Sequence, residues 1–184
     1  MADFYEAVEH VLAHEGAYSY HPHDRGGKTI YGIASASWPD AYDEVMKHYP
    51  KNTAKALEVA QEFYRENFWK ARPFDSISNR DVATFCFDMH VNHSFRAAGR
   101  IIQRACNALS PGQYAPLTED GHMGPKTVRR INALSARYQD ALMMSLAGER
   151  YKYYRTLVQR RPENASFMRG WAARCKPAGW GHDR

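Results

Sequence analysis

Hydrophobic residues recur every three or four positions over most of this chain, which is the spacing of a buried helix face. The first such segment covers residues 4–15. Asp3 and Glu6 open it with the spacing of a capping box, and Gly16 is well placed to end it. The pattern predicts a helix at the start of the chain.

A different pattern occupies residues 17–34. Tyr, Ser, Tyr and His stand before Asp24-Arg25-Gly26-Gly27, and Thr, Ile, Tyr, Gly and Ile stand after it. The two glycines permit the backbone angles that a tight turn needs. This segment is predicted to be a short, irregular β-hairpin.

Helical spacing resumes at about Ser37, and prolines and glycines divide the rest of the chain into separate segments. The pattern predicts helices over residues 53–69, 81–92, 95–109, 125–136 and 138–158. The tail from Pro162 onward is predicted to be rich in turns. The expected fold class is mainly α, a helical globule with one small β-hairpin.

Length and composition limit the possible architectures. A chain of 184 residues suits one well-buried domain, or two small lobes that share a core. Hydrophobic residues make up 44% and charged residues 24%, which excludes a disordered chain. No apolar run approaches the roughly 18–20 residues that span a bilayer. We expect two segments, residues 1–95 and 96–184, packed into one globule.

The first residues and the cysteines bear on the cellular compartment. Residues 1–6 lack the basic start and apolar run of a signal peptide, so we expect synthesis in a cytoplasm. Cys86, Cys106 and Cys175 are odd in number and widely spaced, which argues against a disulfide framework or a CxxC metal site. They are predicted to be buried free thiols.

Charge is distributed unevenly along the chain. Through Phe95 there are nine Lys and Arg against 14 Asp and Glu, and from Arg96 onward there are 16 against six. A basic second half suits a polyanionic partner, such as nucleic acid, an anionic membrane surface or an acidic cell wall. Because no recognised nucleic-acid-binding motif accompanies this charge, we do not expect a nucleic-acid partner.

Two carboxylates and a hydroxyl surround the predicted hairpin. Eight residues separate Glu15, at the end of the first helix, from Asp24 on the Gly-rich turn, and four more separate Asp24 from Thr29. Such a layout can hold two acids on opposite walls of a cleft, as hydrolysis of a glycosidic bond requires. Asp24 can instead be a simple turn cap, since Asp before a turn glycine commonly is.

The residues around this site resemble a known signature. Glu15–Tyr18, Pro22–Thr29 and Gly32-Ile33 resemble the pattern E-G-G-Y, P-x-D-x-G-G-x-T, x-G-I of glycoside hydrolase family 108, the bacterial and phage N-acetylmuramidases. Ala17 replaces the second glycine of that pattern. The resemblance implies a lysozyme-like fold with the hairpin beside an active-site cleft.

The order Glu, Asp, Thr around a small hairpin also resembles that of phage lysozymes. On this analogy Glu15 is the general acid, while Asp24 and Thr29 position or activate a water molecule, which would invert the sugar's configuration. Tyr18 and Tyr31 are predicted to line a sugar subsite, with ordinary hairpin packing as the alternative. His23 is expected to serve packing alone.

A metal site is a different interpretation of the same segment. His10 and His14 stand one helical turn apart, and His21, His23 and Asp24 come after them. The spacing is not that of HExxH, and histidines on a helix surface are commonly exposed to solvent. We expect neither a functional metal nor a cofactor.

Two motifs in the second half extend the resemblance. Phe87–His93 resembles the family's F-D-x-x-V-N-x-G, with His93 in place of the glycine. There Asp88 and Asn92, on one helix face, would contact the saccharide, and Gln103 is predicted to do so too. The alternative for Asp88 and Asn92 is a buried polar network that braces the hairpin.

Residues 120–127 read D-G-x-x-G-P-x-T, which occurs in peptidoglycan-binding helical modules. A tight turn that starts a helix, with Pro125 near its first position, is the structural alternative. Phe167–Arg174 resembles the family's closing F-x-x-G-W-x-x-R, so the resemblance covers about Tyr5 to Cys175. It implies a catalytic segment over 1–95 and a peptidoglycan-binding-like segment over 96–184.

The resemblance implies a lysozyme that cleaves the β-1,4 bond between N-acetylmuramic acid and N-acetylglucosamine. We expect a monomeric phage or prophage endolysin that reaches periplasmic peptidoglycan after holin-type release. Its partners would be peptidoglycan glycan strands and, through the basic second half, an anionic wall or outer-membrane surface. The basic residues assigned to that surface are Arg129, Arg130, Arg137, Arg150, Lys152, Arg155, Arg160 and Arg161. A lytic transglycosylase and a non-catalytic wall-binding protein are the rival functions.

Overall fold

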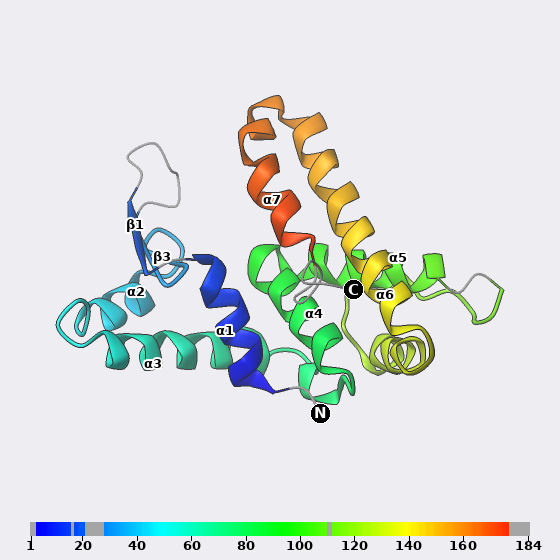
Figure 1. Cartoon of the computed structure of the whole chain (residues 1–184), viewed down its shortest axis with the longest axis horizontal. Helices are drawn as coiled ribbons and strands as arrows, with labels where there is room; N and C mark the ends of the chain where they lie inside the picture. The colour runs from blue at the N-terminus through cyan, green and yellow to red at the C-terminus, as the bar shows by residue number, and fades with distance from the viewer. Residues whose placement is uncertain (1–2, 16, 21–27, 110–111, 177–184) are drawn as a thin grey trace, which may run out of the picture. The chain divides into compact units, whose positions relative to one another are not determined.

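The computed structural model describes residues 3–15, 17–20, 28–109 and 112–176. The described residues form two compact units, one over Asp3–Arg72 and the other from Pro73 onward. Figure 1 shows that both are built mainly of helices, and that the short strands belong to the first unit. The prediction of a mainly α fold with one small β element is confirmed.

The first unit begins with the predicted helix, α1 (Phe4–Glu15). The Asp3 carboxylate accepts a hydrogen bond from the Glu6 backbone N–H at 3.1 Å, as an N-terminal cap does. The apolar face of α1 is buried through Phe4, Val8 and Val11. Burial of this face therefore fixes the helix, and Glu15 is its last residue.

A three-stranded antiparallel sheet comes next, made of β1 (Tyr18–Tyr20), β2 (Lys28–Ile30) and β3 (Ile33–Ala34) in that order. The predicted hairpin corresponds to β1 and β2, and the short β3 adds to it. Thr29 is the central residue of β2 and pairs with Ser19 on one side and with Ala34 on the other. The sheet thus fixes the backbone of Thr29 from both sides.

The turn between β2 and β3 has an uncommon conformation. Tyr31 has a φ of 47° and Gly32 a φ of 77°, and a two-residue type I′ turn needs positive φ at both central positions. For a tyrosine the left-handed region costs roughly 1–2 kcal/mol. Hydrogen bonds offset this cost, because the Tyr31 N–H donates to the Ala17 carbonyl and the Tyr64 hydroxyl donates to the Tyr31 carbonyl, each at 2.9 Å.

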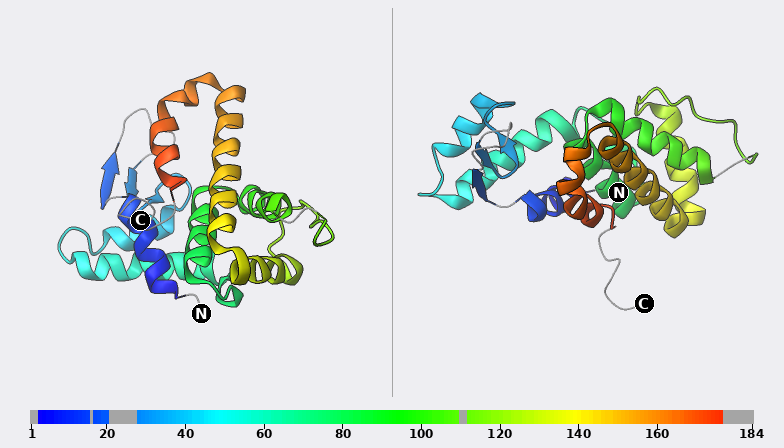
Figure 2. Two further views of the ribbon diagram at one scale, coloured as in Figure 1. Left: turned by 45° about the vertical axis from the view of Figure 1, so that its right-hand side comes forward. Right: turned by 90° about the horizontal axis from the view of Figure 1, so that it is seen from above.

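Three further elements complete the first unit: α2 (Pro39–Met46), α3 (Thr53–Tyr64) and the π-helical turn η1 (Arg65–Trp69). The helix predicted over 53–69 is therefore α-helical only as far as Tyr64. In η1 the Lys70 N–H donates to the Arg65 carbonyl at 2.9 Å, five residues back. Figure 2 shows α2 beside the sheet, where it contacts β2 and β3.

The second unit consists of helices in the described residues. They are η2 (Phe74–Ser76), α4 (Arg80–Asn92), α5 (Phe95–Leu109), α6 (Pro125–Arg160), η3 (Pro162–Phe167) and α7 (Met168–Arg174). The two helices predicted over 125–136 and 138–158 form the single helix α6, which is kinked where Tyr138 has non-helical angles, φ −144° and ψ 45°. Figure 1 shows the change of direction between the two halves of α6.

The prediction of a turn-rich tail is wrong for residues 162–174, which are helical. The Trp171 ring stacks on Tyr154 of α6 at 4.8 Å, and the Phe167 ring stacks on Trp171 at 5.7 Å. Figure 1 accordingly shows α7 folded back beside the second half of α6. Such tertiary packing stabilises a helix too short to form alone.

A buried ion pair lies at the centre of the second unit. The Arg150 side chain is 0% exposed, and its Nη1 donates to Asp88 Oδ2 at 2.5 Å and to the Arg174 carbonyl at 2.8 Å. Arg174 Nη1 lies 3.4 Å from Asp88 Oδ1, which also accepts a hydrogen bond from Asn92 at 2.9 Å. The network joins α4, α6 and α7. The assignment of Arg150 to the basic surface is therefore wrong.

His93 lies next to this network. Its ring centroid is 5.1 Å from those of both Tyr153 and Tyr154. Burial, and then the positive charge of Arg150, lower the pKa of His93 to about 3, while the Asp88 carboxylate opposes them. His93 is consequently neutral in the folded protein at any pH well above that value.

The loop after α5 approaches that helix at a pair of glycines. A Cβ atom placed on Gly99 would lie 2.0 Å from the Gly121 carbonyl oxygen, and Gly121 has a positive φ of 85°. Both positions require glycine, the first for the close approach and the second for its backbone angle.

The three cysteines are free and buried, as predicted for Cys86, Cys106 and Cys175. Burial raises the pKa of the Cys106 thiol to about 12.

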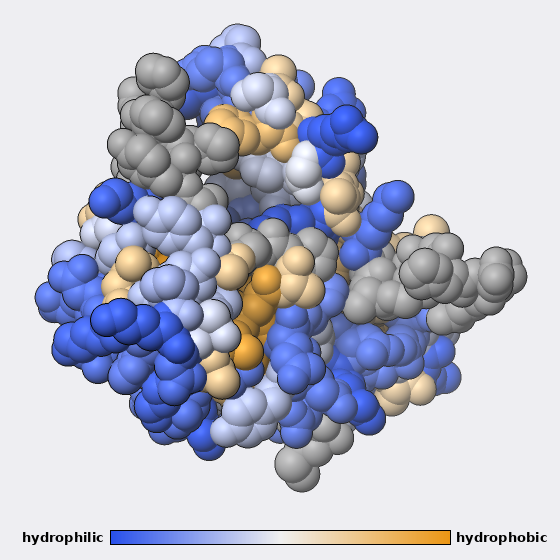
Figure 3. Space-filling model, turned by 60° about the vertical axis from the view of Figure 1, so that its left-hand side comes forward, coloured by the Kyte–Doolittle hydropathy of each residue, from blue (hydrophilic) through white to orange (hydrophobic). Residues whose placement is uncertain are grey.

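In the described residues no helix is long and apolar enough to cross a membrane. Figure 3 shows hydrophilic side chains over much of one face of the molecule.

We predict that Gly99→Ala destabilises the second unit by about 1–3 kcal/mol, because the added methyl group meets backbone that cannot move aside. Gly148→Ala on α6 is the matched control, since its Cβ meets nothing within 4 Å and alanine favours a helix by about 0.5–1 kcal/mol. Urea unfolding measures both. Equal stability of Gly99→Ala and wild type would contradict the contact.

We predict a pH dependence from His93. Between about pH 3 and pH 6.5 the unfolded chain protonates this residue and the folded chain does not, so stability falls as pH falls, by up to about 1.4 kcal/mol per unit. His93→Gln removes this contribution, whereas His122→Gln, at an exposed position, retains it. Unfolding free energies measured across this range test it, and a slope unchanged in His93→Gln refutes it.

Candidate functional site

The first unit places the residues of the N-terminal motif on consecutive elements. Glu15 ends α1, and β1 begins three residues later. The Tyr31 N–H donates to the carbonyl of Ala17, so the turn after β2 is bonded to the chain just beyond Glu15. Helix end and sheet therefore hold Glu15 and the half-buried Thr29 on neighbouring parts of one unit.

Asp24 and His23 lie outside the described residues. The structure therefore gives no geometry for the predicted second carboxylate. The possible metal ligands His21, His23 and Asp24 lie there as well. Among the residues that are described, no group of three or more His, Cys, Asp or Glu side chains is arranged to hold a metal ion.

Tyr18 and Tyr31 come together around a third tyrosine. The Tyr18 ring stacks on Tyr49 at 6.2 Å with an interplanar angle of 13°, and Tyr31 meets Tyr49 edge-on at 6.4 Å. The Tyr18 side chain is 43% exposed and therefore accessible to a ligand. The Tyr31 hydroxyl is instead bonded within the protein, where it donates to the Thr53 carbonyl at 3.5 Å. An exposed ring held by a second ring can stack on a pyranose, so Tyr18 offers such a face.

The surroundings raise the pKa of two tyrosine hydroxyls in this region. Burial and then the neighbouring Tyr49 raise the pKa of Tyr31. Burial, and after it interaction with Tyr18, raises the pKa of Tyr42 on α2. Both groups are hydrogen-bond donors rather than bases at neutral pH. Sequence reasoning missed Tyr49 and Tyr42, because no local spacing links them to the hairpin.

Asp88 and Asn92 belong to the second unit and to its buried network. Asn92 donates to the side chain and to the carbonyl of Asp88, each at 2.9 Å. Arg150 and Arg174, 62 and 86 residues further along the chain, approach the two Asp88 oxygens. The network braces α4, α6 and α7. A saccharide contact for Asp88 and Asn92 stays a prediction.

Gln103 of α5 holds the D-G-x-x-G-P-x-T segment in place. It is 2% exposed, and its Nε2 donates to Asp120 Oδ1 at 2.8 Å and to the His122 carbonyl at 3.0 Å. Its Oε1 accepts from the Gly121 N–H at 2.8 Å, and Thr127 Oγ1 donates to the His122 carbonyl at 3.2 Å. These bonds shape the turn that starts α6. Substrate contact by Gln103 also stays a prediction.

The same hydrogen bonds affect the ionisation of the Asp120 carboxylate in this turn. The Gln103 amide, and then the backbone N–H of His122, lower the pKa of Asp120. The carboxylate is therefore ionised at neutral pH and accepts hydrogen bonds from α5 and from the turn itself. Its acceptor atom Oδ1 is shared by Gln103 and His122.

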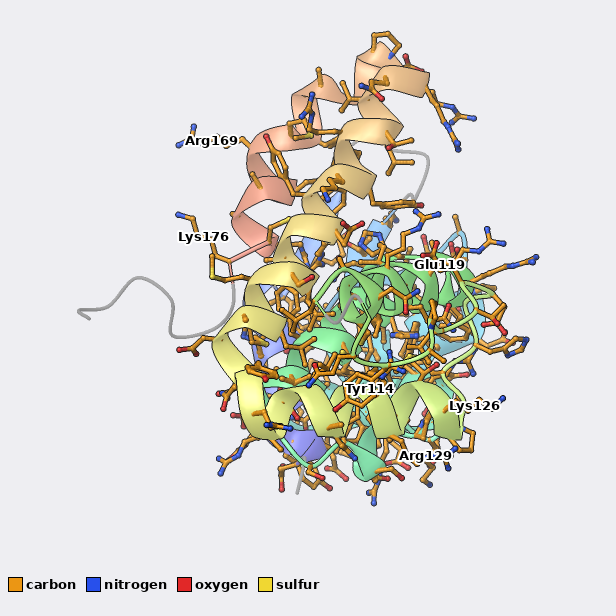
Figure 4. All side chains as sticks on the ribbon, turned by 90° about the vertical axis from the view of Figure 1, so that its right-hand side faces the viewer. Tyr114, Glu119, Lys126, Arg129, Arg169 and Lys176 are labelled. Atoms are coloured by element: carbon orange, nitrogen blue, oxygen red, sulfur yellow. The ribbon has the colours of Figure 1, made fainter. Side chains whose placement is uncertain are left out.

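A pocket of about 1100 Å³ lies beside this turn, within the second unit. Residues 114–118 form one wall and the first turns of α6 form the other, with Gln103 also in the lining. Lys126, Arg129 and Arg130 bring positive charge to it. Figure 4 shows Tyr114 over the first half of α6, with Lys126 and Arg129 projecting from that helix. Sequence analysis assigned Arg129 and Arg130 to a basic surface and did not predict the pocket.

Comparisons with known proteins match the two consecutive parts of the chain to different family models. Residues 8–94 match the family model of glycosyl hydrolase 108, and residues 97–176 match that of a predicted peptidoglycan domain. A solved structure, that of Brucella abortus SagA, is similar in fold, with a TM-score of 0.67 and 24% sequence identity. The similarity covers 94% of this chain and 88% of that chain. No curated protein matches the sequence.

The two family models together span nearly all of the described residues, and they meet at the start of α5. The compact units instead divide at Pro73, because α4 packs with the helices of the second unit. The glycosidase segment therefore contributes a helix to the unit that holds the peptidoglycan domain. Residues 8–94 thus form a segment of the glycosyl hydrolase 108 family, and a predicted peptidoglycan domain follows it over residues 97–176.

Proposed function

We propose that this peptidoglycan hydrolase is an N-acetylmuramidase of the lysozyme type. It cleaves the β-1,4 bond between N-acetylmuramic acid and N-acetylglucosamine. The observation that carries the proposal is the position of Glu15, at the end of α1 and directly before the sheet that bears Thr29. This is the helix-then-hairpin order of the motif that the family model covers.

Glu15 is the general acid of the proposed reaction. Glu15 donates its proton to the glycosidic oxygen as the bond to the anomeric carbon breaks. The leaving sugar departs as a neutral alcohol.

Asp24 and Thr29 supply the water in this proposal. Asp24 takes a proton from a water molecule, and the water oxygen bonds to the anomeric carbon from the face opposite the leaving group. The hydroxyl of Thr29 orients that water from the centre of β2, whose backbone is fixed by strands on both sides. The product is a reducing sugar of inverted configuration.

Tyr18 and Tyr31 form the proposed sugar subsite. The exposed ring of Tyr18 stacks on a pyranose face, supported from behind by Tyr49. Tyr31 contributes to the subsite mainly by shaping the turn that ends β2, which in turn helps to position Thr29.

Positive charge on the second unit attracts the enzyme to its substrate in this proposal. Arg155, Arg160 and Arg161 are exposed near the end of α6, and Figure 4 shows Arg169 and Lys176 projecting from α7 and the residues after it. Peptidoglycan and the outer membrane are polyanionic, so these side chains favour association. We place the protein as a monomeric phage or prophage endolysin, made in the cytoplasm and released to the periplasmic wall.

We predict that Glu15→Gln lowers the turnover of purified peptidoglycan by at least about a hundredfold, the low end of what general acid catalysis contributes. Glu9→Gln is the matched control, because Glu9 is an exposed glutamate on the same helix. Mass spectrometry of the products measures both variants.

The products also distinguish the proposed reaction from its rivals. Reducing muramic-acid ends, made by wild type and Glu9→Gln alone, support the muramidase. Anhydromuramic-acid ends would overturn hydrolysis in favour of a lytic transglycosylase. Wall binding without any product would overturn the enzyme in favour of a binding protein.

We predict that binding of the Glu15→Gln variant to isolated cell walls weakens at least tenfold when the Debye length falls from about 30 Å at 0.01 M salt to about 3 Å at 1 M. The reason is that the second unit's charge acts at long range. Chitin, an uncharged polymer, is the control ligand and should show little salt dependence. Wall binding that is independent of salt would refute the electrostatic attraction.

A further inference from the structure

The pocket beside α6 is shaped in advance by contacts from α5 and α6. Asn107 of α5 bonds both backbone groups of Leu117, accepting from the N–H at 2.8 Å and donating to the carbonyl at 3.0 Å. Arg104 pairs with Glu119 at 2.8 Å. Arg130 donates to the Ala115 carbonyl at 2.9 Å. A wall without regular secondary structure is thus held in one conformation, which lowers the entropy cost of binding.

The walls combine apolar surface with positive charge. Pro116, Leu117 and Ala133 contribute apolar groups, and Tyr114 lies against the Arg130 guanidinium at 4.4 Å. Such a surface fits a ligand that carries small alkyl groups beside charged ones. A volume of about 1100 Å³ has room for an amino sugar with a short peptide.

The charge in the pocket lacks an internal partner. Neither Lys126 nor Arg129 makes an ion pair within the described part of the chain. Arg130 Nη1 is buried and has no hydrogen-bond partner there. The acid in the lining, Asp120, accepts hydrogen bonds from Gln103 of α5 and from the His122 N–H, and it forms no ion pair with the three basic side chains within the described residues. With three cations against this one carboxylate, the pocket carries an excess of positive charge.

The start of α6 adds to this polarity. Its N-cap residue is Gly124, which has no side chain to cap the helix, and Pro125 occupies the first position. The N-terminal end of a helix carries partial positive charge and binds carboxylates. Both Gly124 and Pro125 line the pocket. The N-terminal end of α6 and the basic side chains thus both favour a ligand with carboxylates.

We propose that the pocket between residues 114–118 and the first turns of α6 binds the carboxylate-bearing peptide stem of peptidoglycan. The identity of this ligand rests on the proposed function, since the stem is the part of that substrate with carboxylates and alanyl methyl groups. Lys126, Arg129 and Arg130 pair with the carboxylates, and the methyl groups lie on Pro116 and Leu117. The site recognises the peptide rather than the glycan that is cut.

The test uses the full chain and N-acetylmuramyl tetrapeptide, which has no glycosidic bond between sugars. Binding is measured by calorimetry for wild type and for Lys126→Met/Arg129→Gln. The control is Lys70→Met/Arg80→Gln, which removes the same charge from exposed positions outside the pocket lining. A second ligand has its carboxylates converted to amides. Digestion of peptidoglycan is assayed in parallel for each variant.

We expect the pocket variant to bind the peptide at least about tenfold more weakly, the effect of one lost charge-assisted hydrogen bond, and the control to bind as wild type does. The amidated ligand should show the same loss with wild type. Equal binding by the pocket variant, or equal binding of the amidated ligand, overturns the proposal. So does equally tight binding of inorganic polyphosphate, which would indicate a general anion site.

The two proposals fail in different ways. If wild type cuts peptidoglycan but does not bind the muramyl peptide, the pocket assignment is wrong and the muramidase stands. If wild type binds the peptide and the pocket variant does not, while neither releases reducing ends, the pocket assignment stands and the muramidase is wrong.

Discussion

A guanidinium buried as completely as that of Arg150 is tolerated only where other groups replace the water that it has lost. Here Asp88 and the Arg174 carbonyl do so for Nη1, and the Tyr154 hydroxyl does so for Nε, and these groups come from three helices. Removing one partner of such a pair leaves an uncompensated charge and typically costs about 3–5 kcal/mol. The packing of α4, α6 and α7 therefore depends on a single arrangement of these side chains.

The sequence motifs of this chain are therefore of two kinds: those used in the proposed reaction and those bonded within the folded protein. The N-terminal motif places Glu15 at the end of a helix and Thr29 at the centre of a sheet, and the proposed reaction uses both residues. In the second half, Asp88 and Gln103 are occupied by partners within the protein. A motif shared with a family can thus report the requirements of a fold as well as those of a reaction.

Local spacing was sufficient to predict α1, the β1–β2 hairpin, α4 and α5, because each buries one face of regular periodicity. It could not predict contacts between distant residues. The burial of Arg150 depends on Asp88, 62 positions away, and α7 depends on the stacking of Trp171 on Tyr154. The pocket was missed for the same reason, since Asn107 and Arg130 fix its wall from different helices.

The kink at Tyr138 separates two parts of α6, the longest helix, that have different roles. Before it, α6 supplies the basic wall of the pocket, and after it, α6 supplies Arg150 to the core. Because the backbone angles at Tyr138 are not helical, the two halves of α6 run in different directions, and the half that lines the pocket is distinct from the half that pairs with Asp88. Substitutions in the first half of α6 can therefore change the charge of the pocket wall at positions that take no part in the Arg150–Asp88 pair.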